Sequence, residues 1–215
     1  MYITGKLYHL KEQIFVVFNC RKRSFFFLNN TFYLQNHHFV GLFCVKMLKY
    51  HKLCEKEGDI HLRILVFSDS HHDVKSCINV INNIIGVDMI LHAGDFADDA
   101  EKIKEAFPDI TVNYVAGNCD FGIAPKELVF HLGGKKILLT HGHLYNVKND
   151  YGFSALISHA EELGCDCAVF GHTHRGFCDT NGRITLLNTG SIRDGKTFGV
   201  IEIENGKLRA AVCDA

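Results

Sequence analysis

Five segments of this 215-residue chain each run a short apolar stretch directly into residues that can bind a metal ion. The seven candidate ligands at these polar ends are all oxygen or nitrogen donors. A four-coordinate zinc needs four ligands, whereas two ions roughly 3.5–4 Å apart can share a carboxylate and hold a phosphoryl group between them. The candidate ligands exceed what one ion needs, so the sequence predicts a two-metal site. They are Asp69, His71, Asp95, Asn118, His141, His172 and His174.

The elements that must position these residues are predicted to be buried strands. Short runs rich in Val, Ile, Leu and Phe that end at Gly or Asp are typical of strands in an α/β sheet. Such sheets bind ligands beyond the carboxyl ends of their strands, so we expect the polar clusters to meet at one edge. The expected strands are residues 63–68, 88–93, 111–116, 135–140 and 165–170.

Each cluster alone is weak evidence, because Asp-x-His and Gly-Asp are common and a single histidine is more often a surface or core residue than a ligand. The combination is specific, since all five expected strand ends carry ligands. The turn Gly171-His172-Thr173-His174 is also too tight to bury both histidines against apolar neighbours. A metal site is therefore favoured, and its ligand types suit Mn, Fe, Zn or Co better than copper.

The order of motifs, Asp-x-His, Gly-Asp, Gly-Asn-x-Asp, His-Gly-His and Gly-His-Thr-His, resembles that of the calcineurin-like metallophosphoesterases. Gly117-Asn118-Cys119-Asp120 looks like the motif of their small YfcE-type phosphodiesterase branch. The resemblance covers residues 64 to about 212. It implies an α/β fold of the metallophosphoesterase type, a mixed β-sandwich flanked by helices, with the active site at the carboxyl ends of the strands.

The resemblance also implies two metal ions that share the carboxylate of Asp95. One set of ligands is Asp69, His71, Asp95 and His174, and the other is Asp95, Asn118, His141 and His172. We expect Mn²⁺, with Zn²⁺, Fe²⁺, Ni²⁺ and Co²⁺ as alternatives. A water or hydroxide between two dications is acidified toward neutrality, so phosphate-ester hydrolysis needs no covalent enzyme intermediate. The candidate catalytic residues are Asn118, Cys119 and His141.

Cys119 departs from many larger relatives, which carry histidine there to help protonate the leaving alkoxide. A thiol with an unperturbed pKa near ~8.5 is a poor general acid, so we expect a preference for diesters or activated leaving groups. The alternative is that Cys119 is a small buried residue that merely fits.

Several residues beside the motifs are weaker candidates. Arg175, Ser191 and Arg193 lie on loops near the expected cleft, where they could contact the second ester substituent, with a solvated loop position as the alternative. His72 and His143 adjoin ligands, and either could line the cleft or face solvent.

Composition predicts one catalytic domain, over residues 62–215, in a chain that is 47% hydrophobic. The net charge of −1 gives no signal for nucleic acid or an anionic membrane, so we expect a small phosphodiester or phosphate-ester substrate and leave a homo-oligomer open. Nine irregularly spaced cysteines favour a reducing cytoplasm over a disulfide framework. Cys165 and Cys167 are expected to face the same side of a strand and to pack there.

Residues 1–61 are predicted to be an N-terminal extension with no recognisable domain. They lack proline and a sustained hydrophobic period, and their apolar runs are shorter than the ~20 residues of a membrane span. Their Phe, Asn, Tyr, Lys and Leu content is what A/T-rich non-coding DNA gives when read as codons. We therefore expect a mis-annotated start, with the native protein beginning at Leu62; a membrane-surface or partner-binding arm is the alternative.

The remaining elements are predicted from periodicity and from capping residues. Helices are expected at residues 73–85, with Asp73 as the N-cap, at 97–107, and from about 153 to 163, before Gly164. Strands are expected at residues 183–187, 197–204 and 207–213, the last two forming a hairpin across Asn205-Gly206.

A metal-dependent phosphodiesterase of the EC 3.1.4 type is the leading hypothesis. One alternative is a non-catalytic scaffold of the same fold that binds proteins, although such a module tolerates loss of ligands and here all the ligand positions are filled. The other is a phosphomonoesterase, which Cys119 disfavours. The natural substrate depends on loops that the motifs do not specify.

Overall fold

The computed structural model describes residues 4–10, 13–20, 23–28, 61–122, 124–180 and 182–215. The chain divides into two compact units, Met1–Lys52 and Leu53–Ala215. In the first unit an antiparallel sheet has the order β1-β2-β3. Its strands are β1 (Thr4–Leu10), β2 (Gln13–Cys20) and β3 (Arg23–Leu28). This sheet lies within the N-terminal extension predicted for residues 1–61, and most of the remainder of that extension lies outside the described residues.

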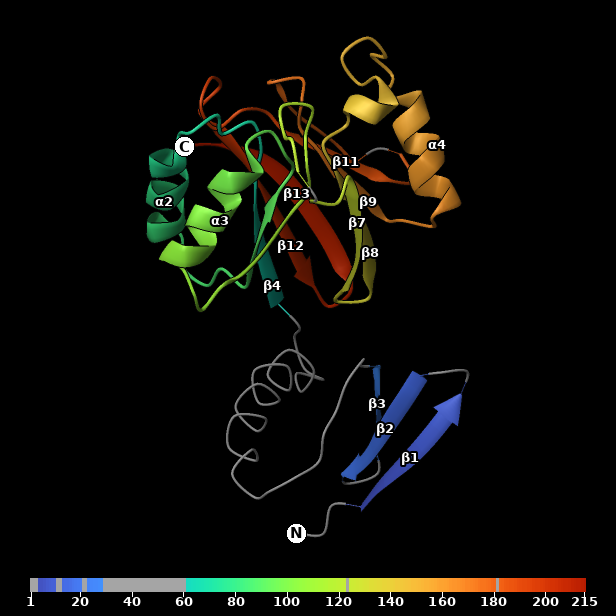
Figure 1. The fold of residues 1–215 in the computed structure, drawn as a ribbon. Helices are drawn as coiled ribbons and strands as arrows, with labels where there is room; N and C mark the ends of the chain where they lie inside the picture. Colours follow the sequence, from blue (N-terminus) through green and yellow to red (C-terminus); the bar gives the residue numbers. More distant parts are fainter. Residues whose placement is uncertain (1–3, 11–12, 21–22, 29–60, 123, 181) are drawn as a thin grey trace. The chain divides into compact units, whose positions relative to one another are not determined.

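Two five-stranded sheets form the centre of the second unit (Figure 1). The first sheet has the order β13-β12-β4-β5-β6 and the second the order β10-β11-β9-β8-β7. The strands of the first sheet are β4 (His61–Phe67), β5 (Met89–His92), β6 (Thr111–Tyr114), β12 (Thr197–Glu204) and β13 (Lys207–Asp214). Those of the second are β7 (Glu127–Leu132), β8 (Lys135–Thr140), β9 (Cys167–Phe170), β10 (Gly176–Asp179) and β11 (Thr185–Thr189).

Both sheets are mixed. In the first, β4, β5 and β6 are parallel, and β12 is antiparallel to both β4 and β13. In the second, β8, β9 and β11 are parallel, with β7 and β10 as antiparallel edge strands. All five expected ligand-bearing strands are present, whereas β7 and β10 were not expected. Neither edge strand contains a fully buried residue, although Leu128, Phe130 and Leu132 alternate along β7 and pack against the core.

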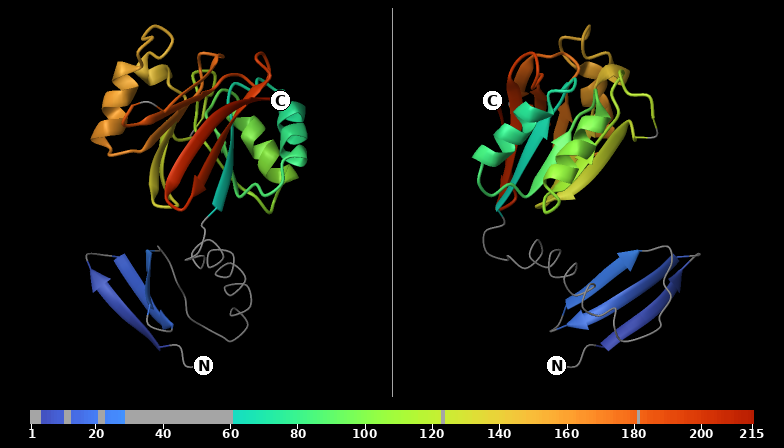
Figure 2. Two further views of the ribbon diagram at one scale, coloured as in Figure 1. Left: turned by 180° about the vertical axis from the view of Figure 1, so that it is seen from behind. Right: turned by 60° about the vertical axis from the view of Figure 1, so that its left-hand side comes forward.

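Helices cover the outer faces of the two sheets, as Figure 2 shows. Helices α2 (Val74–Asn83) and α3 (Ala97–Ala106) pack on the first sheet, through a cluster that joins Leu65 and Phe67 to Cys77 and Ile103. Helix α4 (Ser154–Glu162) packs on the second sheet and follows the short 3₁₀ helix η1 (His143–Tyr145). The predicted fold class, a mixed β-sandwich flanked by helices, is confirmed, and so are the three expected helices.

The inner faces of the sheets share one core, which contains residues of both, such as Ile64 and Leu139. Cys167 lies in this core, whereas Cys165 packs on the helix side of the second sheet. The expectation that the two cysteines face the same side is therefore wrong, because β9 begins only at Cys167 and Cys165 precedes the strand. Both are free thiols, as are Cys77, Cys119, Cys178 and Cys213.

Local signals set the ends of several elements. Asn205 and Gly206 both have positive φ, 51° and 74°, as a type I′ hairpin turn between β12 and β13 requires. Gly164 ends α4 with a φ of 68°. Asp73 caps α2 and accepts hydrogen bonds from the backbone N–H and the hydroxyl of Ser76. In the described residues, no helix combines the length and apolar character needed to cross a bilayer.

Replacing Asp73 by alanine should lower the free energy of unfolding by about 1 kcal/mol, because the first turn of α2 loses its acceptor. Asp73→Asn is the matched control, since asparagine caps helices equally well. Urea unfolding followed by circular dichroism measures both. Equal destabilisation by the two substitutions would instead implicate the ion pair between Asp73 and Lys196.

Candidate metal centre

The predicted ligands gather into two groups beyond the carboxyl ends of the strands. In each group, one possible ligand atom per residue lies within 4.8 Å of the others. The first group is Asp69, His71 and His174, and the second is Asp95, His141 and His172. The seventh predicted ligand, Asn118, places its Oδ1 3.1 Å from His141 Nε2. The clusters follow strands of both sheets, so the site lies where the two sheets meet and not at the edge of a single sheet.

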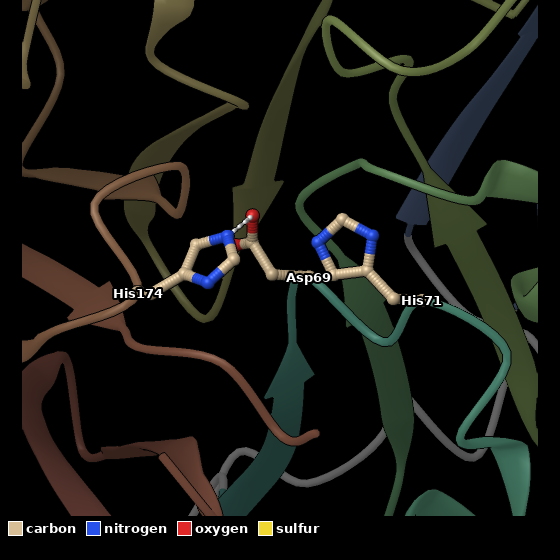
Figure 3. Close-up of side chains that lie close together, drawn as sticks. All are labelled: Asp69, His71 and His174. Atoms are coloured by element: carbon tan, nitrogen blue, oxygen red, sulfur yellow. Dashed lines mark ion pairs between the residues drawn. The ribbon is translucent and has the colours of Figure 1, made fainter. Parts of the chain in front are cut away.

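In the first group, which Figure 3 shows, the buried carboxylate of Asp69 lies between two imidazole rings. His174 Nε2 is 3.0 Å from Asp69 Oδ1, yet that oxygen accepts no hydrogen bond, and the buried Nε2 of His71 has no partner. His174 Nδ1 lies 2.9 Å from a carboxylate oxygen of Asp194. From this contact we assign the proton of a neutral His174 to Nδ1, which leaves the Nε2 lone pair directed toward Asp69.

In the second group, His141 is oriented in the same way by a backbone carbonyl. Its Nδ1 is 2.8 Å from the carbonyl oxygen of Ala93, which can only accept, so Nδ1 carries the proton. The opposite nitrogen, Nε2, lies 3.1 Å from His172 Nδ1 and 3.4 Å from Asp95 Oδ1. His141 Nε2 and Asp95 Oδ1 therefore present lone pairs toward one another. A cation among them, or a proton on Nε2, is needed to offset their repulsion.

The pKa values of the second group are consistent with this arrangement. Burial would raise the pKa of Asp95, but its contacts with His141 and with the Cys119 N–H outweigh burial, so the pKa lies well below its ordinary value. Burial lowers the pKa of His141, and the carboxylates of Asp95 and Asp69 more than compensate and raise it. Burial, aided by the nearby His141, lowers the pKa of His172 to about 4. An ionised Asp95 and a neutral His172 are the ligand forms that metals bind.

Two buried carboxylates make the site fit divalent cations. Asp69 and Asp95 are 0% and 2% exposed, and neither has a lysine or arginine partner among the described residues. Asp69 Oδ2 accepts hydrogen bonds from the Ser68 hydroxyl and the His172 N–H, which offsets part of its burial. Buried carboxylates are otherwise paired or bound to metal. Asp69 Oδ1 accepts no hydrogen bond and lies 3.0 Å from His174 Nε2, so it is a candidate ligand atom.

The backbone is strained at the ligand positions. Asp69, His71, Asp95, His172 and His174 all have positive φ, between 40° and 68°. Residues other than glycine rarely adopt this left-handed region, and each such residue costs on the order of 1–3 kcal/mol when strongly disfavoured. Strain of this kind concentrates at functional sites.

Two glycines allow the backbone to pass against the carboxylates. A Cβ at Gly117 would lie 2.1 Å from Asp95 Oδ1. A Cβ at Gly171 would lie 1.8 Å from Ser68 Oγ and 2.6 Å from Asp69 Oδ2. Any side chain at either position would therefore displace a candidate ligand.

Three polar residues that were not predicted as site residues hold the ligand loops. Asp194 orients His174, as described above. Asp120 accepts hydrogen bonds from the N–H groups of Gly117 and Ala97, and so ties the Asn118 loop to the start of α3. Asn188 donates to Gly171 O and Thr173 Oγ1 in the His172–His174 turn. Asp120 ends the motif Gly117-Asn118-Cys119-Asp120, whereas nothing in the sequence distinguishes Asp194.

The structure separates the weaker candidates. Cys119 is exposed, so the alternative that it is a buried filler is wrong. Partial desolvation and the Asp95 carboxylate raise the pKa of Cys119 to about 11. Ser191 is buried and donates to the backbone oxygen of Asp69, so it supports the loop and does not face substrate. Arg193 remains a candidate, because its half-exposed guanidinium lies 3.5 Å from the carbonyl oxygen of His71.

The other three lie around the same groups. Arg175 is exposed on the loop after the His172–His174 turn. His72 is exposed and packs its ring on Phe96. His143 is half-buried, with its ring centroid 5.4 Å from that of His141, and its Nδ1 has no hydrogen-bond partner.

Comparisons with known proteins agree with this geometry. Residues 62–206 match a family model described as the calcineurin-like phosphoesterase superfamily domain. The probable metallophosphoesterase YsnB of Bacillus subtilis is 32% identical over 151 residues, which cover 67% of this chain and 86% of YsnB.

Solved structures share the fold. An uncharacterised Streptococcus pneumoniae protein, described as a predicted phosphoesterase, has a TM-score of 0.59 and 28% identity over 72% of this chain and 90% of its own. Vacuolar protein sorting 29 of Cryptosporidium parvum has a TM-score of 0.58 and 20% identity over 71% of this chain and 97% of its own. At 20% identity, the second comparison speaks for the fold alone.

The close approach at Gly117 gives a test of the metal centre. Gly117→Ala should weaken Mn²⁺ binding by at least about tenfold, because the new methyl group displaces the Asp95 carboxylate. Gly122→Ala lies in the same loop with nothing within 4 Å of its Cβ, so it is the matched control and should bind Mn²⁺ like the wild type. Titration calorimetry on the metal-stripped full-length chain measures both. Equal affinities of the two variants would contradict a metal at Asp95.

Proposed function

This chain belongs to the calcineurin-like phosphoesterase superfamily, and from that premise we propose that it is a metal-dependent phosphodiesterase acting on small phosphate esters. The observation that carries the proposal is the pair of Asp/His groups around buried carboxylates, in which carboxylate and imidazole lone pairs face one another with no lysine or arginine partner among the described residues. Residues 62–215 form the proposed catalytic domain, and a reducing cytoplasm remains its predicted location.

Two divalent ions are proposed to occupy the two groups. Asp69, His71, Asp95 and His174 hold the first ion in this proposal, and Asp95, Asn118, His141 and His172 hold the second. When bound, the ions supply an activated hydroxide from water at neutral pH and offset negative charge on the phosphoryl oxygens. Mn²⁺ is the proposed ion, with Zn²⁺, Fe²⁺, Ni²⁺ and Co²⁺ as alternatives, since nitrogen and oxygen ligands accept each of them.

The protein's own part is to present ligands in the correct form and direction. Asp194 and the Ala93 carbonyl hold His174 and His141 with their Nε2 lone pairs facing the ion positions. Hydrogen bonds of this kind fix the tautomer and raise the basicity of a ligand. The Arg193 guanidinium, at the rim of the first group, is placed to contact a phosphate oxygen or the second ester substituent.

The preference for diesters is proposed from Cys119. A thiol is a weak donor of its proton, and partial desolvation and the Asp95 carboxylate raise the pKa of this one to about 11. Without a better acid beside the cleft, the leaving group must depart with little protonation, which favours aryl and other activated esters over alkyl monoesters. The proposed catalytic residues are therefore Asn118, Cys119 and His141. In this proposal Asn118 and His141 contact the reacting groups, and Cys119 limits protonation of the leaving group.

A protein-binding scaffold is the alternative, and the fold shared with vacuolar protein sorting 29 is what favours it. The fold does not require Asp69 and Asp95 to be buried, nor His141 and His174 to be oriented toward them. A phosphomonoesterase is the other alternative, and the nature of Cys119 argues against it.

Metal-stripped full-length protein should hydrolyse bis-p-nitrophenyl phosphate faster than p-nitrophenyl phosphate once Mn²⁺ is added, and should be inactive without metal. Asp95→Asn should lower turnover by at least about 10²-fold, because it removes the proposed shared ligand. Asp98→Asn, which changes an exposed carboxylate nearby, is the control and should retain activity. If folded, metal-loaded protein hydrolyses neither ester, the result would favour the protein-binding scaffold.

The role of Cys119 is tested by Cys119→His, which should raise monoesterase turnover relative to diesterase turnover, since an imidazole protonates an alkoxide more readily than this thiol. Cys119→Ser keeps the size of the side chain without a useful acid, so its ratio should stay at the wild-type value. Steady-state rates with the same two esters give the ratio. An unchanged ratio in Cys119→His would overturn the general-acid argument.

A further inference from the structure

A buried polar network adjoins the loops of Asp69, His71 and Asp95 and contains none of the proposed ligands. Its members are Ser70, His92 and Asp99, each 0% exposed. Ser70 stands between the ligands Asp69 and His71, His92 is the last residue of β5, and Asp99 is in the first turn of α3. A buried carboxylate costs several kcal/mol unless it is paired and hydrogen-bonded, so the presence of Asp99 calls for an explanation.

Each hydrogen bond of the network is donated toward Asp99. The Gly94 N–H donates to His92 Nδ1 at 3.2 Å, which leaves the proton of a neutral His92 on Nε2. His92 Nε2 is 3.1 Å from Ser70 Oγ and donates to it, and the Ser70 hydroxyl donates to Asp99 Oδ2 at 2.8 Å. The His72 N–H donates to the same oxygen of Asp99 at 2.8 Å.

Every polar side-chain atom of this network, which we call the relay (Ser70, His92 and Asp99), has a hydrogen-bond partner. Asp99 Oδ1 is 3.0 Å from Lys102 Nζ, which supplies the countercharge one turn further along α3. Burial lowers the pKa of His92 to about 4, so the ring stays neutral, as the relay requires. Fully satisfied buried networks of this kind favour one arrangement of the groups they join.

The relay joins the loop that carries Asp69 and His71 of the first group to the loop that carries Asp95 of the second. At one end it holds Ser70 and His72, which flank His71 of the first group. At the other end it holds Gly94, which precedes Asp95 of the second group. Gly94 also accepts from the Asp69 N–H through its carbonyl oxygen, at 3.1 Å.

These loops need such a restraint because their backbone is strained. Asp69, His71, His72, Gly94 and Asp95 all have positive φ, and for the four that are not glycine this conformation persists only if the surroundings hold it. A small rearrangement of either loop would change the distance between the two ligand groups.

We propose that Asp99 is a positioning residue that sets the spacing between the two metal groups, acting through Ser70 and His92. It touches neither metal nor substrate. This inference rests on the metal-binding role proposed above, and it assigns the geometry of that centre to a carboxylate on α3.

The test compares Asp99→Asn and Ser70→Ala with Asp98→Asn in the metal-stripped full-length chain. Asp98 lies in the same first turn of α3 but is exposed, so its substitution removes an equal charge without touching the relay. Mn²⁺ affinity by calorimetry should fall by about 10–100-fold in the first two variants and stay at the wild-type value in the control. Ser70→Ala removes one hydroxyl and leaves Asp99 bonded to Lys102 and the His72 N–H, so it keeps the test open if Asp99→Asn does not fold.

Electron paramagnetic resonance of the Mn²⁺-loaded proteins gives a readout that a purely structural role would not move. The wild type and Asp98→Asn should show the signal of two magnetically coupled ions, and the relay variants a signal of isolated ions. Variants with a lower unfolding temperature but unchanged affinity and coupling would overturn the positioning role. A wild type that binds fewer than two ions would overturn the proposed two-metal function itself.

Discussion

The structure depends on burying two carboxylates, those of Asp69 and Asp95, without a lysine or arginine to balance them among the described residues. Such burial is unfavourable by several kcal/mol per ion unless hydrogen bonds and positive charge offset it. The chain supplies hydrogen bonds through Ser68, His172 and Cys119. It leaves the remaining lone pairs facing imidazole nitrogens, which two dications would satisfy.

The packing of the β-sandwich offsets the unfavourable burial of these two carboxylates, because the hydrophobic core is large. The central strands are buried on both faces, between the shared inner core and the helices. Parallel neighbours such as β4 and β5 end side by side, so their loops begin at the same level and bring Asp69 and Asp95 together. A net stability of 5–15 kcal/mol, typical of folded domains, leaves room for a few left-handed residues only if the rest of the packing is regular.

The sequence predicted the parts of this structure whose signals are local. The apolar strands before each ligand, the capped helix after Asp73 and the Asn205-Gly206 hairpin all follow from composition and spacing over a few residues. The supporting partners could not be predicted in that way. Asp99 meets Ser70 across 29 residues and Asp194 meets His174 across 20, and only the folded chain brings them together. The edge strand β10 has only four residues and none is buried, so it gives no local signal. In β7 the alternation of Leu128, Phe130 and Leu132 was present in the sequence and was missed.

The orientation of the candidate ligands favours catalysis over a protein-binding scaffold. A scaffold needs the two sheets and their outer surface, and it gains nothing from an imidazole whose far nitrogen is held by a carboxylate or a carbonyl. Here His174 and His141 are both held in that way, at 2.9 and 2.8 Å. The left-handed backbone at the candidate ligands and the buried charge of Asp99 are both unfavourable for folding, and they give no advantage to a surface that only binds proteins. These costs are understandable if the loops must hold two ions at a fixed separation, since phosphoryl chemistry between two metals depends on that distance.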